Sequence, residues 1–205
     1  MSDPGHWDRA YARSAEALSW FEADPVRSLA LLDRAGLRPG QAVVDVGGGA
    51  SLLVDALLAR GLGPVTVLDL SPVALATSQS RLGPLAERVD WIAGDVTAWR
   101  PEPGGYALWH DRAVFHFLTT AAGQAAYAAV LHRALAPGGA AVVATFAPDG
   151  PERCSGLPVQ RWSSEDLAQA LGLRLDHAER FVHVTPSGNE QRFQMALMRK
   201  EGEDG

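Results

Sequence analysis

Three consecutive glycines, Gly47, Gly48 and Gly49, follow an acid, Asp45, and precede an amphipathic stretch. Each glycine carries backbone entropy that folding must remove, so three in a row are costly unless something approaches the main chain closely. Between a strand and a helix, such a turn presents free amide N–H groups and has no side chain to block a ligand. The pattern predicts a cradle for a flat or charged ligand, with a tight structural turn as the plainer alternative.

A second acid, Asp69, stands 24 positions after Asp45, within the apolar run Val65–Leu70. A carboxylate at the end of a second strand can accept hydrogen bonds from the two hydroxyls of a ribose. Ser71 and Pro72 are typical of a helix start, so capping of that helix is the alternative role for the acid. The two acids and the glycine turn together indicate a nucleoside-binding site.

Ionisable side chains gather again at His110, Asp111 and Arg112, directly after the apolar run Tyr106–Trp109, and at His116. Desolvation penalises each charge at the carboxyl end of a central strand, so such groups either pair or take part in chemistry. We expect Asp111 to act as a catalytic base or orienting group, with His110 and His116 as the next candidates. The alternative is an Asp111–Arg112 ion pair, with His116 packed on a helix face.

Two further segments are candidates for the walls of a substrate site. Trp7, Tyr11, Trp20 and Phe21 precede the first strand and could form a lid, because aromatic faces attract cations. An amphipathic helix that buries them against the sheet is the alternative, and both can hold. The long connection from Pro148 to Val159 is expected to form one wall of an acceptor site.

Cys154, in that connection, is the single cysteine. It excludes an intramolecular disulfide and a thiolate metal cluster, and we expect no metal site. Cys154 is expected to be exposed to substrate, but no base adjoins it in sequence, which disfavours a nucleophilic role.

The elements that must position these residues are apolar strands that alternate with helices. Strands are expected at Val43–Val46, Val65–Leu70, Val89–Ala93, Tyr106–Trp109 and Ala140–Phe146, and helices at about Leu52–Ala59, from Ser71, and at Gly123–Leu135. Crossover helices allow consecutive strands to run in the same direction, so the pattern predicts a parallel sheet that is buried on both faces.

The pattern changes after Ala147. A helix is expected to begin at Ser163, followed by two runs, Leu173–Val184 and Gln191–Met198, with a short polar connection between them. So short a connection predicts an antiparallel hairpin. The predicted fold class is α/β, a doubly wound and mostly parallel sheet with a C-terminal antiparallel hairpin and helices on both faces.

Composition sets further bounds. A chain of 205 residues with 47% hydrophobic and 20% charged residues is typical of a single soluble globular domain. The 24 acids against 18 bases give a net charge of -6, which argues against a nucleic-acid partner. The chain shows no apolar run of about 20 residues and no signal peptide, so we expect no membrane association and a cytoplasmic location.

The order of the motifs resembles the class I, seven-stranded S-adenosylmethionine-dependent methyltransferase superfamily over roughly Leu37 to Lys200. Asp45–Ser51 is similar to its acid-x-Gly-x-Gly signature, with Ser51 where a third glycine is usual. The resemblance implies a seven-stranded Rossmann-like sheet and S-adenosylmethionine as cofactor, with S-adenosylhomocysteine as product. It implies one domain over residues 1–200, with a helical lid or cap at 1–36, a core at 37–200 and a disordered tail at 201–205.

The resemblance also implies roles for individual residues. Asp45 would anchor the methionine amino group, Asp69 would hold the ribose, and Asp95 would flank the adenine unless it is only a turn residue. The full expected set of cofactor contacts is Asp45, Gly47, Gly48, Gly49, Asp69, Leu70, Ser71, Gly94, Asp95, Val96 and His110. The expected lid or substrate contacts are Trp7, Tyr11, Trp20, Phe21, Arg112 and Cys154.

Two subfamily resemblances bear on the acceptor. The Trp-Asp-x-x-Tyr opening and the Asp-Arg-x-x-Phe run are similar to protein-lysine methyltransferases, although Arg112–Val114 departs from their Asp-Lys-Gly-Thr pattern. The proline-rich connection into Ser163 is similar to that of thiol methyltransferases of the thiopurine type. A small-molecule acceptor is favoured because no further domain remains to dock a macromolecule, whereas the acidic chain leaves a basic protein lysine open.

Two other functions remain as alternatives. A nicotinamide-dependent oxidoreductase would use a related glycine turn, but Leu52 stands where Gly-x-Gly-x-x-Gly needs glycine, and the chain ends in a hairpin. A module that binds the cofactor without turnover is the alternative outside enzymology.

Overall fold

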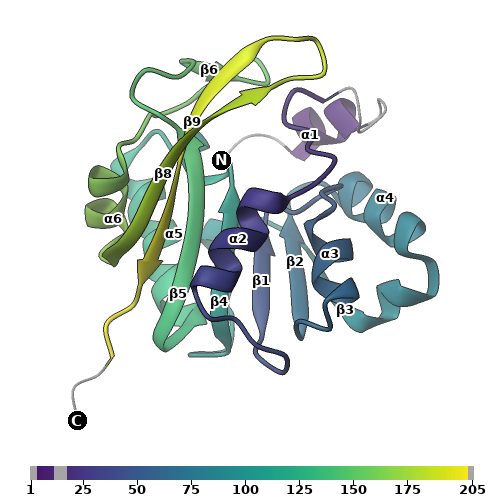
Figure 1. Cartoon of the computed structure of the whole chain (residues 1–205). Coiled ribbons are helices and arrows are strands. Elements are labelled where there is room, and N and C mark those ends of the chain that lie inside the picture. Colours follow the sequence, from purple (N-terminus) through teal and green to yellow (C-terminus); the bar gives the residue numbers. More distant parts are fainter. Residues whose placement is uncertain (1–3, 12–17, 203–205) are drawn as a thin grey trace.

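Seven strands form one sheet in the spatial order β3-β2-β1-β4-β5-β9-β8 (Figure 1). The computed structural model describes residues 4–11 and 18–202. The strands of this sheet are β1 (Val43–Val46), β2 (Val65–Asp69), β3 (Val89–Ala93), β4 (Tyr106–Arg112), β5 (Leu135–Phe146), β8 (Arg174–Val184) and β9 (Glu190–Arg199). Neighbouring strands from β3 to β5 are parallel, whereas β9 is antiparallel to both β5 and β8. The predicted fold class, including the C-terminal hairpin, is confirmed.

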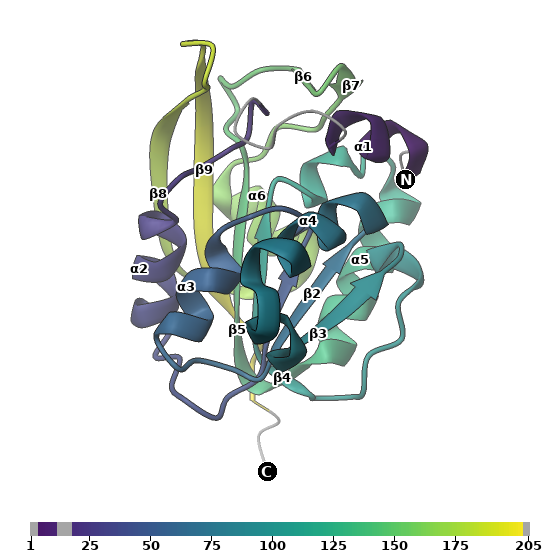
Figure 2. The same cartoon turned by 90° about the vertical axis from the view of Figure 1, so that its right-hand side faces the viewer.

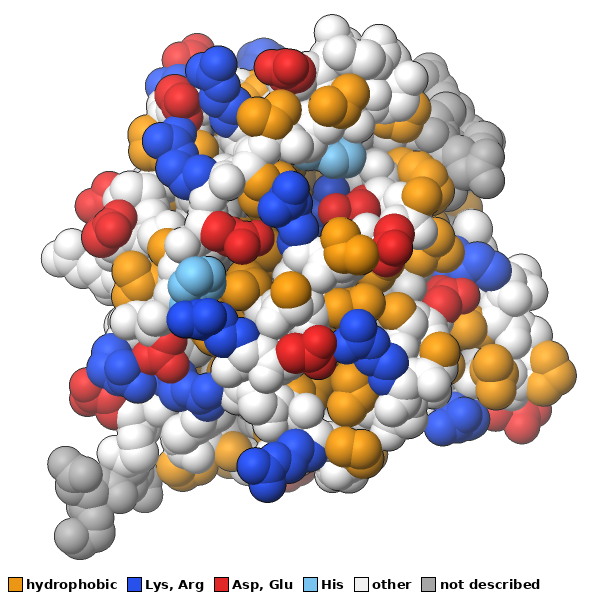
Figure 3. Space-filling view, in the orientation of Figure 1, with side chains coloured by type: hydrophobic (Ala, Val, Ile, Leu, Met, Phe, Trp, Pro, Cys, Tyr) orange, Lys and Arg blue, Asp and Glu red, His pale blue; other side chains and the backbone are white. Residues whose placement is uncertain are grey.

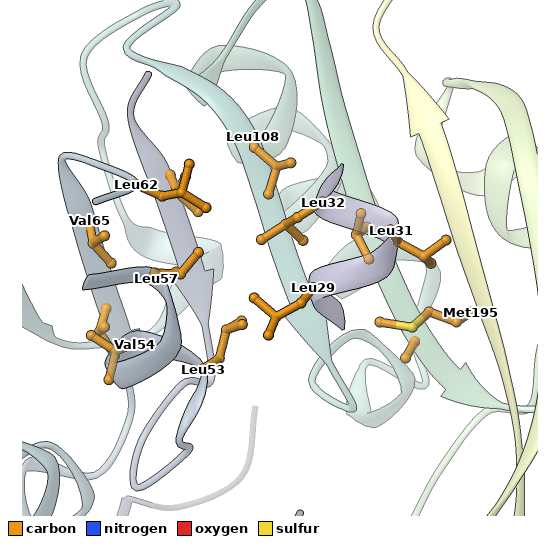
Figure 4. Close-up of a cluster of buried hydrophobic side chains, with 14 of the residues drawn as sticks. Leu29, Leu31, Leu32, Leu53, Val54, Leu57, Leu62, Val65, Leu108 and Met195 are labelled. Carbon is orange, nitrogen blue, oxygen red and sulfur yellow. The ribbon is translucent and has the colours of Figure 1, made fainter. Parts of the chain in front are cut away.

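Helices cover both faces of the sheet (Figures 1 and 2). One face packs against α2 (Val26–Arg34), α3 (Leu53–Ala59) and α4 (Pro72–Leu82), and the other against α5 (Ala121–Ala134) and α6 (Ser164–Leu171). Leucines and valines of α2 and α3 fill the first interface (Figure 4). Because both faces are covered, every residue of β1 and β2 is buried, which explains their continuous apolar sequences.

Polar caps fix where the helices begin. The side-chain oxygens of Ser71 and Ser163 accept hydrogen bonds from the third backbone N–H that follows each, at 3.1 Å in both cases, so both predicted helix starts are confirmed. Thr120 caps α5 in the same way at 3.2 Å, so this helix begins about two residues before the predicted Gly123.

Strand β4 is longer than the sequence pattern predicted. It continues through His110, Asp111 and Arg112, because the last two pair with β5 at Val143 and Ala144. The expectation that these ionisable residues follow the strand is wrong. Successive side chains of a strand point to opposite faces, so Asp111 is separated from His110 and Arg112 by the sheet itself.

The segment from Pro148 to Val159 is more ordered than a plain loop. It contains a small antiparallel pair, β6 (Arg153–Cys154) and β7 (Leu157–Pro158). The remaining elements are α1 (Pro4–Tyr11) and the short 3-10 helices η2 (Gly83–Arg88), η3 (Val96–Ala98) and η4 (Phe115–Phe117). Together with α1, the β6–β7 segment lies beyond one end of the parallel strands (Figures 1 and 2).

The surface carries charge of both signs. On the face shown in Figure 3, acidic and basic side chains are interspersed among apolar ones. Within residues 4–11 and 18–202, none of the helices combines the length and apolar character that crossing a bilayer requires. Residues 203–205 of the expected tail lie outside the described residues.

Candidate active site

A pocket opens where β1, β2 and β4 end. This is the point at which the strand order reverses between β1 and β4, the usual ligand site of open α/β sheets. The pocket holds about 710 Å³ of empty space, part of it open to solvent. Its lining residues are Trp7, Tyr11, Trp20, Val46, Gly47, Leu68, Asp69, Leu70, Gly94, Val96, Arg112, Ala113, Val114, Phe117 and Cys154. We call this the main pocket.

A second pocket adjoins the main one and shares Tyr11, Trp20, Gly47 and Arg112 with it. Its other lining residues are Leu18, Phe21, Glu22, Asp45, Gly48, Ala50, Ser51 and His110. We call it the side pocket. Nε1 of Trp20 donates a hydrogen bond to the Tyr11 hydroxyl (3.3 Å), so two aromatic residues from before β1 form part of the shared wall.

The glycine turn is tightly enclosed by its own chain. A Cβ on Gly47, which has φ of 68°, would overlap Val114, and one on Gly48 would lie 2.5 Å from Asp45 Oδ2. A Cβ on Gly49 would lie 2.8 Å from both Asp69 Oδ2 and the Tyr11 hydroxyl oxygen. A side chain at Gly48 or Gly49 would displace an acid of the site, and one at Gly47 would displace Val114, so the turn serves internal packing as well as access to the main chain.

Asp69 faces the main pocket from the end of β2. Its Oδ1 accepts a hydrogen bond from the Ser71 backbone N–H (2.8 Å), and Ser71 Oγ donates to Asp8 of α1 (2.6 Å). Burial raises the pKa of Asp69 to about 7, and the nearby carboxylates of Asp45 and Asp8 add to this rise. The carboxyl group both holds the turn and presents an acceptor to the pocket.

Asp45 lies in the side pocket and is held by His110. Nδ1 of His110 lies 2.7 Å from Asp45 Oδ1, and its Nε2 lies 2.9 Å from the hydroxyl of Ser28 in α2. All three residues are buried. Both ring nitrogens already have partners inside the protein, so the geometry opposes the expected catalytic role of His110 and indicates that it positions Asp45.

Asp111 points away from both pockets, toward α5. Its carboxylate accepts hydrogen bonds from the backbone N–H groups of Val114 (2.8 Å) and Phe115 (3.0 Å) and from the hydroxyl of Tyr127 (2.5 Å). Burial raises its pKa to about 6, against the effect of these donors. The geometry contradicts a base facing the acceptor. Asp111 instead fixes the turn after β4, where Val114 lines the main pocket.

His116 lines neither pocket. It is fully buried against Phe117 and Phe146, and burial lowers its pKa to about 3, so the ring is neutral at pH 7. The structure therefore agrees with the packed alternative and opposes a catalytic role. The alternative Asp111–Arg112 ion pair is also wrong, because Arg112 faces the other side of the sheet and lies 3.5 Å from Glu22.

The structure brings the expected lid residues to the pockets. Trp7 packs edge-on against Phe117 and Trp20, with ring centroids 5.1 and 5.8 Å apart, and Phe21 lines the side pocket. Cys154 lines the main pocket, and burial raises its pKa to about 12, so it remains a neutral thiol at pH 7.

The expected contacts after β3 fall into two groups, those that line the main pocket and one that does not. Gly94 and Val96 line the main pocket, whereas Asp95 caps η3 by accepting from the Thr97 N–H (2.7 Å), which is the turn role considered as its alternative. Glu22, Ser28, Phe117 and Tyr127 complete the site or its support and were not anticipated from the sequence.

Comparison with known proteins identifies the family. Residues 43–139 match the family model of a methyltransferase domain, and the match spans the glycine turn, Asp69 and all of β4. This match and the observed fold support the expected class I S-adenosylmethionine-dependent methyltransferase superfamily. The match also opposes the nicotinamide-dependent oxidoreductase alternative. A comparison with curated protein sequences finds no significant match.

Solved structures share the fold of this methyltransferase over nearly its whole length. One is the 1,6-didemethyltoxoflavin-N1-methyltransferase of Burkholderia thailandensis with bound 1,6-didemethyltoxoflavin and S-adenosylhomocysteine (23% identity, 98% of this chain and 92% of that one, TM-score 0.70). Another comes from echinomycin biosynthesis, in the conversion of a disulfide bond into a thioacetal group (20% identity, 98% and 94%, TM-score 0.74). A third is the [4+2]-cyclase SpnF (14% identity, 96% and 93%, TM-score 0.71). At these identities the likeness shows the fold alone.

Proposed function

We propose that this methyltransferase transfers a methyl group from S-adenosylmethionine to a small-molecule acceptor bound in the main pocket. The observation that carries the proposal is that Asp45, Asp69 and the glycine turn line adjoining pockets at the switch point of the sheet. When bound, the cofactor supplies an electrophilic methyl carbon, whose bond to sulfur breaks, with the electron pair returning to sulfur, as the acceptor's electron pair forms the new bond.

The charges of the site fit the cofactor. Asp69 is buried, and the nearby charges that raise its pKa are carboxylates, so two ribose hydroxyls that donate to it would stabilise its ionised form. Asp45 and Glu22 in the side pocket suit the ammonium group of a methionine moiety. Leu70, Gly94 and Val96 offer the apolar, uncrowded wall that an adenine needs.

The chain's own residues contribute alignment and exclusion of water rather than proton transfer. The ring nitrogens of His110 and the carboxylate of Asp111 are hydrogen-bonded within the protein, and none of His110, Asp111 and His116 lines the main pocket. Cys154 remains protonated, and burial raises the pKa of Tyr11 well above its ordinary value. An in-line displacement needs a positioned nucleophile more than a base, and Trp7, Trp20 and Phe117 enclose the site that would position it.

A small acceptor fits this enclosure better than a protein side chain. Two segments that are far apart in the sequence, α1 and the β6–β7 pair, lie at the main pocket, since Trp7 and Cys154 both line it. We find no feature of the described residues that favours a protein lysine, and the expected single domain with a lid at 1–36 is kept as part of this proposal.

The test begins with binding. Calorimetry should show that the protein binds S-adenosylmethionine and S-adenosylhomocysteine but not NAD. A methylation assay with labelled cofactor over a metabolite panel should then reveal a small product. Binding without any transfer would leave a cofactor-holding module or another reaction on this fold, and absence of binding would refute the proposal.

A further inference from the structure

Arg112 brings a positive charge to the junction of the main and side pockets. It lines both, and 16% of its side-chain surface is exposed. Nη1 donates to the backbone oxygen of Trp20 (2.7 Å), and Nε lies 3.5 Å from Glu22 Oε2. Nη2 is buried and has no hydrogen-bond partner among residues 4–11 and 18–202. The planar guanidinium is thus held by two nitrogens while the third stays unpaired.

The neighbouring residues satisfy this charge only in part. Glu22 is the one carboxylate within ion-pair distance in the described chain, and 3.5 Å is long for a charge-assisted hydrogen bond. The other groups that act on Arg112 are the Cys154 thiol, the Tyr11 hydroxyl and Asp45, which is already held by His110. The ring of Phe193 also faces the guanidinium, with its centroid 6.0 Å from Cζ. A buried, unpaired donor of a charged group is costly unless a ligand completes it.

The walls around Arg112 describe the rest of such a ligand. In the main pocket its neighbours are the aromatic rings of Trp7, Trp20 and Phe117 and the aliphatic Val114. Among the lining residues of that pocket, the other acidic or basic side chain is Asp69, which the proposed function assigns to the ribose. A ligand beside Arg112 would therefore combine an apolar, preferably flat body with one negative group.

We propose that the methyl acceptor is a small organic acid whose anionic group binds the guanidinium group of Arg112 at the junction of the two pockets, while its apolar part packs against Phe117 and Trp7. This inference rests on the proposed function, since it names the acceptor of the same site. An anionic acceptor also offsets two positive charges, the guanidinium and the sulfonium of the cofactor, in a place with low exposure to water.

The first experiment uses the wild-type protein saturated with S-adenosylhomocysteine. Calorimetry compares 2-mercaptobenzoate and benzoate with their uncharged amides, which have nearly the same shape. We expect each acid to bind at least tenfold more tightly than its amide. Equal affinity within a pair, or no binding by either acid at millimolar concentration, would overturn the proposal.

Two variants then assign the effect to Arg112. Arg112→Gln should remove the preference for acid over amide, and Glu22→Gln should strengthen acid binding several-fold, because it removes the competing carboxylate. Arg27→Gln is the matched control, because Arg27 of α2 stacks over Phe181 of β8 and lines neither pocket. This variant should keep the wild-type preference for acid over amide. An acid preference that persists in Arg112→Gln would overturn the assignment.

A third comparison separates the acceptor from the cofactor's own carboxylate. S-adenosylhomocysteine carries that carboxylate, and 5′-methylthioadenosine lacks it. We expect Arg112→Gln to change the affinity for both by less than threefold. A tenfold loss for S-adenosylhomocysteine alone would show that Arg112 binds the methionine end, which overturns the acceptor assignment and leaves the proposed function intact. Failure of the wild type to bind S-adenosylhomocysteine would instead refute the proposed function.

Discussion

The ends of β2 and β4 both carry buried aspartates, yet the two carboxylates face different surroundings. Asp69 faces the main pocket and accepts hydrogen bonds from the backbone of Ser71 and Gly49, and the nearby carboxylates of Asp45 and Asp8 oppose its ionisation. Asp111 faces α5, away from both pockets, and accepts three hydrogen bonds from the protein. A carboxylate that the chain satisfies is part of the architecture, whereas one that the chain leaves under-satisfied is available to a ligand.

The largest expected effect is the loss of cofactor binding in Asp69→Ala. Two charge-assisted hydrogen bonds to a ribose would be lost, which corresponds to about 3–6 kcal/mol, or at least a hundredfold in affinity. Calorimetry with S-adenosylhomocysteine measures it, with the exposed Asp90→Asn as control. Because burial and nearby carboxylates disfavour the ionised form of Asp69, a neutral side chain at this position should stabilise the protein without ligand. Asp69→Asn should therefore raise the melting temperature at pH 8. A wild-type affinity for S-adenosylhomocysteine in Asp69→Ala would show that Asp69 does not bind the cofactor.

Asp111→Ala should affect folding more than binding. It leaves two buried N–H groups and the Tyr127 hydroxyl without their acceptor, which costs about 2–4 kcal/mol and lowers the melting temperature by roughly 4–16 °C. Tyr127→Phe removes one of these bonds and should cost about 1 kcal/mol. Thermal unfolding checks both. If Asp111→Asn kept the wild-type melting temperature and cofactor affinity but lost turnover, the result would assign Asp111 a role in catalysis.

The third prediction concerns pH. Ribose hydroxyls donate to the ionised form of Asp69, whose pKa in the empty protein is raised to about 7, so binding favours loss of its proton. Affinity for S-adenosylhomocysteine should therefore fall as pH drops below about 7, approaching tenfold per unit, and level off above it. The facing groups are Asp8, Asp45 and Tyr11. Titration between pH 5.5 and 8.5 measures the slope, and an equal slope in Asp69→Asn would assign it to another group.

The smallest expected effect is on the lid. Asp8→Ala removes the hydrogen bond from Ser71 Oγ to α1 and should weaken cofactor binding about fivefold, or about 1 kcal/mol. Arg9→Ala, on the exposed side of the same helix, is the control. Fluorescence titration of Trp7 and Trp20 measures both variants. An equal effect of the two would mean that α1 acts as a whole and not through Asp8.

The sequence predicted the region around β1 and β2 well because its signals are local. Apolar runs, a glycine turn and a serine cap each act within a few residues, so the bounds of these strands and the start of α4 were within one residue of the structure. The aspartates at their ends were also expected at the pocket, although their roles stay proposals.

The end of β4 and the turn after it were predicted poorly because their structure depends on partners far along the chain. His110, Asp111 and Arg112 look like the end of a strand, but β5 extends the pairing through all three. Alternation then sends Asp111 to Tyr127 and His110 to Ser28, and neither partner is visible from spacing. Likewise, Glu22 and Phe117 reach the pockets through tertiary packing, for which the sequence carries no local signal.

The cluster of acids around the two pockets has a thermodynamic consequence for the whole molecule. Burial and the nearby carboxylates of Asp45 and Asp8 disfavour the ionised form of Asp69. Ionisation of Asp69 therefore lowers the stability of the fold, and a bound cofactor that donates hydrogen bonds to the carboxylate would offset this cost. By mass action, the fraction of folded protein would rise with the concentration of S-adenosylmethionine. A low concentration of this methyl donor would therefore increase degradation of the enzyme.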